Sequence, residues 1–68
     1  MGERWTDQDE RRVRHAEDRW YTGDTAALED LPPLLAAACR YRLGFGNSGD
    51  LEALTADERA MLFEAVAR

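Results

Sequence analysis

The glycine-rich segment at residues 44–49, with the sequence GFGNSG, is the part of this chain whose spacing most directly suggests chemistry. It matches the G-x-G-x-x-G pattern, which holds dinucleotide phosphates when it follows a β-strand and opens a helix. Here the preceding residues have a helical composition, and no strand is indicated anywhere in the sequence. We therefore interpret the segment as the end of a helix followed by a loop, and we expect no cofactor.

The single histidine, His15, and the single cysteine, Cys39, are the other residues with distinctive chemistry. A zinc site needs several such ligands, and a nucleophilic cysteine needs an activating base. We expect His15 on the solvated surface and Cys39 buried as a small apolar residue. A lone cysteine also excludes an intramolecular disulfide. The sequence therefore predicts no catalytic residues and no metal ligands, and we expect a protein that is not an enzyme.

The net charge of the chain indicates which kinds of partner it could bind. Fourteen acidic residues oppose nine basic residues, all arginine, so the net charge is −5. An acidic chain is not suited to nucleic acid or to an anionic membrane surface, and it favours a partner with a basic surface. The sequence shows neither a signal peptide nor a run of about 18 apolar residues, so a cytoplasmic protein is expected. The absence of lysine and isoleucine points to a GC-rich genome, bacterial or phage.

Three main helices are predicted, in an all-α bundle that forms one domain over residues 1–68. Residues 7–21 form the first, which Thr6 caps and Gly23 ends. The central helix covers 33–43, with proline in its first turn and Gly44-Phe45 at its end. The third covers 56–67, since Thr55 and Glu58 form a capping box. Short helical turns are expected at 25–30 and 50–54.

The apolar faces of these helices predict how they pack. Trp5, Val13, Ala16 and Trp20 form a narrow seam on the first helix, with Asp9 in its middle. On the third helix an apolar face is expected to be interrupted by Arg59. If these two helices pack together, Asp9 and Arg59 could form an ion pair; otherwise each side chain extends to the rim.

The apolar residues of the third and central helices are predicted to be buried or exposed in the same way. We expect the third helix to bury Leu62, Phe63 and Val66. The central helix should bury a wide arc of apolar residues, and its remaining alanines should point elsewhere and permit close approach of a neighbour. That arc comprises Leu34, Leu35, Ala38, Cys39 and Leu43, and the remaining alanines are Ala36 and Ala37.

Tryptophan and arginine are enriched at binding hot spots, which identifies candidate interface residues. The candidates are Trp5, Trp20, Arg40, Tyr41, Arg42 and Arg59. Each has a second interpretation: the tryptophans could pack in the core, and the basic segment 40–42 could contact the chain's own acidic residues.

The leading functional hypothesis is a non-enzymatic protein-interaction module. Such a protein would be a small acidic regulator, inhibitor or assembly factor that binds a protein partner or forms a homo-oligomer. A phage could encode it. The alternative is a helix-turn-helix DNA-binding regulator with residues 33–43 and 56–67 as its helix pair. A connection of about a dozen residues is longer than the usual three- to four-residue turn, and Asp57 and Glu58 would face the phosphates.

Overall fold

The computed structural model describes residues 4–67, which form four helices and no strand. They are α1 (Asp7–Tyr21), α2 (Pro33–Leu43), α3 (Ser48–Glu52) and α4 (Ala56–Val66). This confirms the predicted all-α bundle of three main helices. The first two have the predicted ends, and the third stops one residue early, because Ala67 is its C-cap.

The two short helical turns were predicted less accurately. Residues 25–30 form consecutive turns rather than a helix, with hydrogen bonds such as that from the Glu29 N–H to the Ala26 carbonyl, 3.0 Å. The turns end where Pro32 disfavours helical backbone at the residue before it. The second element begins at Ser48, earlier than predicted, because Asn47 caps it and Asp50 completes a capping box.

The ends of the main helices follow the predicted signals. Thr6 caps α1 and Thr55 caps α4, each in a reciprocal capping box. Gly44 ends α2 with a φ of 98°, in the left-handed region that glycine adopts without strain. The following Phe45 N–H donates to the Arg40 carbonyl at 2.9 Å, so the chain folds back at this point as the sequence predicts.

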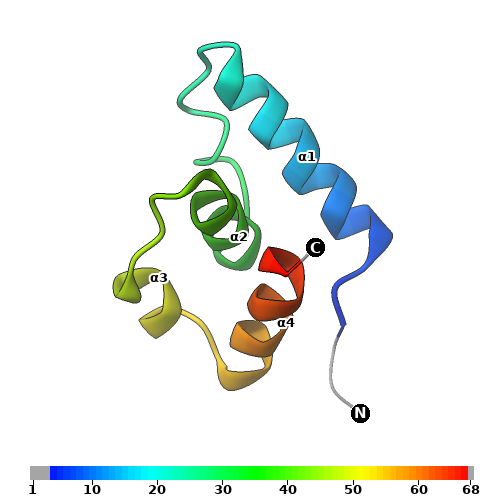
Figure 1. Ribbon diagram of the computed structural model, residues 1–68, viewed down its shortest axis with the longest axis vertical. Coiled ribbons are helices and arrows are strands. Elements are labelled where there is room, and N and C mark those ends of the chain that lie inside the picture. Colours follow the sequence, from blue (N-terminus) through cyan, green and yellow to red (C-terminus); the bar gives the residue numbers. More distant parts are fainter. Residues whose placement is uncertain (1–3, 68) are drawn as a thin grey trace.

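Helix α2 is the centre of the fold, and α1, α3 and α4 pack around it (Figure 1). Five consecutive residues of α2 are buried, from Leu35 to Cys39. Ala36 and Ala37 were expected to lie outside the apolar arc and to permit close approach of a neighbour, and both are buried. Of the predicted arc, Leu34 and Leu43 are only partly buried.

Of the three residues predicted for the buried face of α4, the prediction is confirmed for Leu62 and wrong for Phe63 and Val66. Met61, Leu62 and Ala65 are buried, whereas Phe63 and Val66 are 62% and 40% exposed. The helix is apolar on both faces, so its composition does not select a side, and docking against α2 decides which residues are covered.

The conditional ion pair between Asp9 and Arg59 does not form. The Asp9 carboxylate accepts from the Thr6 N–H at 3.2 Å, and Arg59 donates to the Leu51 carbonyl at 2.8 Å. Both α1 and α4 make their main helix contacts with α2, and packing of α1 against α4, on which the ion pair was conditional, is not among these main contacts. Within residues 4–67, no helix has the length and apolarity needed to cross a membrane.

Candidate functional site

The two tryptophans occupy different environments. Trp5 is 3% exposed in the core, and its indole N–H donates to Glu10 Oε1 at 2.9 Å. Its buried ring is not part of the surface that a partner could contact, so its place among the interface candidates is corrected. Trp20 is partly buried and packs against the core at the end of α1.

The basic segment at residues 40–42 is engaged within the chain rather than free. Arg40 pairs with Asp50 of α3 at 2.7 Å, and the Tyr41 hydroxyl donates to the Asn47 carbonyl, also at 2.7 Å. Arg42 turns toward two acidic residues of α1. Of the two interpretations of this segment, contact with the chain's own acidic residues is therefore the one that the structure contains.

Glu10 is the centre of a buried ionic cluster. Its carboxylate accepts two hydrogen bonds from Arg42, at 2.9 and 3.0 Å, and one from Arg14 at 2.7 Å, besides that from Trp5. Glu10 as a whole residue is 8% exposed to solvent. The hydrogen bonds from Arg42, the largest influence, outweigh desolvation and lower the pKa of Glu10 from 4.5 to about 2. Glu10 is therefore fully ionised near neutral pH and joins α1 to α2.

Glu17 lies seven residues after Glu10 on α1, and its negative charge is less well compensated. Its Oε1 is 3.3 Å from an Arg42 nitrogen, an ion pair by distance, but it accepts no hydrogen bond from any residue between 4 and 67. Desolvation by burial is the largest influence on this carboxyl and raises its pKa, with the Arg42 charge opposing that effect. The Arg42 guanidinium thus contacts both carboxylates, and it donates hydrogen bonds to Glu10 at shorter distances than its contact with Glu17.

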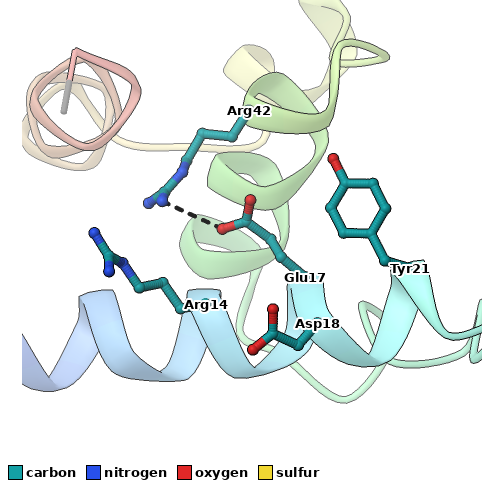
Figure 2. Close-up of a pocket in the computed structure, with 5 residues that line it drawn as sticks. All are labelled: Arg14, Glu17, Asp18, Tyr21 and Arg42. Atoms are coloured by element: carbon teal, nitrogen blue, oxygen red, sulfur yellow. Dashed lines mark ion pairs between the residues drawn. The ribbon is translucent and has the colours of Figure 1, made fainter.

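A pocket of about 320 Å³ opens beside this pair, between α1 and the last turn of α2. Figure 2 shows Arg42 reaching from α2 toward Glu17, with the remaining lining side chains all on α1. The five lining residues are Arg14, Glu17, Asp18, Tyr21 and Arg42. The pocket therefore presents both charges and one aromatic ring.

An aromatic surface, formed by Trp20, Tyr21 and Phe45, adjoins the pocket through Tyr21. The Trp20 ring meets Tyr21 edge-on and stacks on Phe45, with centroids 5.6 Å apart in both pairs. Tyr21 is 70% exposed and Phe45 is 43% exposed. Two exposed rings are thus held by a third ring that packs against the core.

The histidine and cysteine lie as the sequence predicted. His15 is exposed on α1. Cys39 is fully buried, and desolvation, with the nearby Glu17 charge, raises its pKa to about 11, so the thiol stays protonated near neutral pH. Among the described residues, no group of three or more acidic, histidine or cysteine side chains could hold a metal ion.

The GFGNSG segment ends α2 at Gly44, as expected, but only residues 45–47 form a connection, because Ser48 and Gly49 already belong to α3. Gly46 lies so close to Tyr41 that an added Cβ would be 2.5 Å from the ring atoms Cγ and Cδ2. Asn47 then begins α3 by accepting from the Gly49 N–H at 2.9 Å. The preceding element is the helix α2, so the context that a dinucleotide site requires is missing from this part of the chain.

The sequence reasoning identified Trp20 and Arg42 but missed Glu10, Glu17, Tyr21 and Phe45. A signal was present: Glu10, Arg14, Glu17 and Tyr21 recur at the helical spacings of four, three and four residues. That spacing places acids, a base and an aromatic ring on one stripe of α1. Their partner Arg42 is 32 residues from Glu10, and no local pattern indicates that pairing.

Comparison with protein-family models gave no match, and no curated protein or solved structure is significantly similar to the chain.

Proposed function

We propose that this chain is a non-enzymatic protein-interaction module that binds a protein partner through its aromatic surface. The observation that carries the proposal is the pair of exposed rings, Tyr21 and Phe45, held against Trp20. Tryptophan, tyrosine and arginine predominate among residues that anchor protein interfaces. Exposed aromatic groups that lie together, next to a pocket, are typical of such an anchor.

The packing of the aromatic surface against the core, through Trp20, supports the same proposal. Trp20 packs against the core, so the rings that it contacts have a support that is already ordered before binding. Ordering flexible side chains on binding lowers affinity, and a surface that is already held avoids much of that cost. A small regulator, inhibitor or assembly factor could act through such a surface alone.

Charge indicates the nature of the partner. The chain carries a net charge of −5, so a basic surface on the partner would be attracted and oriented by it. The two arginines that line the pocket, Arg14 and Arg42, are both paired with Glu10, and Arg42 also lies 3.3 Å from Glu17. This arrangement supports a binding role rather than a catalytic one.

DNA binding remains the weaker proposal, because no observation favours it. The short helix α3 lies in the connection between α2 and α4, the pair that a helix-turn-helix would use. Helix α4 would approach the phosphates with Asp57 and Glu58 in its first turn, and two of its exposed side chains are Phe63 and Val66.

Affinity capture from a lysate tests the proposal if it compares two matched double variants. Tyr21→Ala with Phe45→Ala removes the exposed rings and leaves Trp20 in place. Phe63→Ala with Val66→Ala, on the exposed face of α4, is the control because it removes similar exposed apolar groups elsewhere. We expect wild type and control to retain the same protein, and the first variant to retain it at least tenfold more weakly. Circular dichroism verifies that each variant is folded.

Three other results would contradict the proposal. Equal retention by both double variants would show that the aromatic surface is not the interface. Loss of retention only in the α4 variant would show that the interface lies on that helix instead. Retention that nuclease abolishes would support nucleic-acid binding instead. Light scattering on the pure variants identifies a second copy of the chain as the partner if the oligomer depends on Tyr21 and Phe45.

A further inference from the structure

The pocket beside the aromatic surface adjoins an ionic cluster in which carboxylates outnumber arginines. Two carboxylates, of Glu17 and Asp18, and two guanidinium groups, of Arg14 and Arg42, line the pocket, and both arginines also pair with the carboxylate of Glu10 outside the lining. Arg42 is largely committed to Glu10, to which it donates two hydrogen bonds. The cluster of these five charged residues therefore has three carboxylates for two guanidinium groups, and one negative charge is left without a matching cation from them.

Glu17 is the group on which this deficit falls. Its side chain is 16% exposed, yet its Oε1 accepts no hydrogen bond from the described part of the chain, and its contact with Arg42 is 3.3 Å long. A buried carboxylate with incomplete compensation gains from any additional cation nearby. An anion would meet the two carboxylates that line the pocket, whereas the two arginines of the lining are already paired with Glu10.

We propose that the pocket receives a basic side chain, arginine or lysine, from the protein partner. The cation lies beside the carboxylates of Glu17 and Asp18 and against the exposed Tyr21 ring, which also lines the pocket. Arginine over a tyrosine ring is stabilised by the negative face of the ring. This inference rests on the proposed function, and it specifies the residue of the partner that lies next to the aromatic surface.

The dimensions of the pocket agree with a single side chain. Its volume of about 320 Å³ is at the lower end of the range for pockets that hold complete small ligands. It is bounded by α1 and by Arg42 of α2, and Figure 2 shows Tyr21 on the side away from Arg14. A basic residue could thus enter the pocket while an adjoining apolar residue of the partner covers Phe45.

The test uses small probes and does not need the partner to be known. Uniformly ¹⁵N-labelled protein is titrated with N-acetyl-arginine methylamide and, separately, with the citrulline analogue, which has the same shape without the charge. We expect saturable shifts of the Glu17, Asp18 and Tyr21 amide signals with the arginine probe, at millimolar concentration, and none with citrulline. Glu17→Gln should weaken binding at least fivefold, whereas Glu52→Gln, an exposed residue of α3, should not change it.

A second readout separates a direct role of Glu17 from a structural one. Since a bound cation and a proton oppose each other at this carboxyl, saturation with the arginine probe must lower the pKa of Glu17. A ¹³C titration of the carboxyl group, with and without the probe, measures this change. An unchanged pKa at saturation would overturn the assignment, as would equal shifts with citrulline or unaltered binding to Glu17→Gln.

The two proposals fail in different ways. If the arginine probe does not bind but capture still depends on Tyr21 and Phe45, the pocket inference is wrong and the interaction surface stands. If the probe binds but capture is independent of the rings, the pocket accepts a basic group without being part of the proposed interface.

Discussion

Arg42 donates two hydrogen bonds to Glu10, at 2.9 and 3.0 Å, across 32 residues of sequence. Glu10 lies in the first turn of α1 and Arg42 in the last turn of α2, so each charge is also at the helix end that favours it. This pair fixes α1 against the central helix. It also sets the position of the arginine that forms one wall of the pocket.

Replacing Arg42 by alanine should therefore be severely destabilising. The change leaves two carboxylates, Glu10 and Glu17, buried without their shared cation, and removal of one partner of a buried pair costs about 3–5 kcal/mol. A domain of this size has roughly 3–5 kcal/mol of stability, so we expect Arg42→Ala to be largely unfolded at 25 °C. Far-UV circular dichroism and urea unfolding measure the loss.

Arg14→Ala is the matched control for this experiment. Arg14 also binds Glu10, but its side chain is 71% exposed, and exposed ion pairs contribute less than about 1 kcal/mol. Similar losses in the two variants would show that burial of Arg42 does not govern the energetics of the cluster.

Acid should remove the contribution of Glu10. Its pKa is about 2 in the folded protein and 4.5 ordinarily, so the unfolded chain takes up a proton first as the pH falls. The stabilisation is complete above about pH 4.5 and is lost progressively from there to about pH 2, on the order of 3 kcal/mol in total. Urea unfolding of wild type and Glu10→Gln between pH 7 and pH 2 should show a stability difference that shrinks across this window. A constant difference would contradict the assignment.

Glu17 should behave in the opposite way. Its pKa is raised in the folded protein, so ionisation there destabilises the native state above that pKa, and the effect disappears below the ordinary value of 4.5. Glu17→Gln should thus stabilise the protein at pH 7 and raise its Tm. The gain should vanish below pH 4.5. Thermal unfolding at pH 7 and pH 4 provides the comparison, and destabilisation at pH 7 would show that the Arg42 contact outweighs the desolvation.

The contrast between local and distant signals explains what the sequence could predict. Thr6, Gly44, Thr55 and Glu58 act within a few residues of their own position, so the helices that they begin and end were predicted almost to the residue. Short elements depend on weaker signals, and the capping box at Asn47 was missed because a glycine-rich sequence resembles a loop.

Packing was harder to predict, because helices that are apolar on more than one side do not specify which side is buried. Leu62 and Phe63 are neighbours in α4, but one is 1% exposed and the other 62%. The pocket depends on the crossing of α1 and α2, which brings Arg42 to Glu17. Sequence reasoning found Arg42 and Trp20 from their residue types, and it had no means of placing them relative to Glu10, Tyr21 and Phe45.

The close approach of Gly46 to Tyr41 gives the last prediction. A Cβ at Gly46 would overlap the Tyr41 ring at 2.5 Å, so Gly46→Ala must displace the ring and weaken the hydrogen bond from its hydroxyl to the Asn47 carbonyl. Such overpacking costs about 1–3 kcal/mol. Gly49→Ala is the control, since its Cβ meets only the Asn47 side chain, at 3.0 Å, and alanine favours the helix there. Urea unfolding should show a clear loss for the first variant and a change below about 1 kcal/mol for the second. If both lose equally, the glycines of this segment serve backbone flexibility rather than contact with Tyr41.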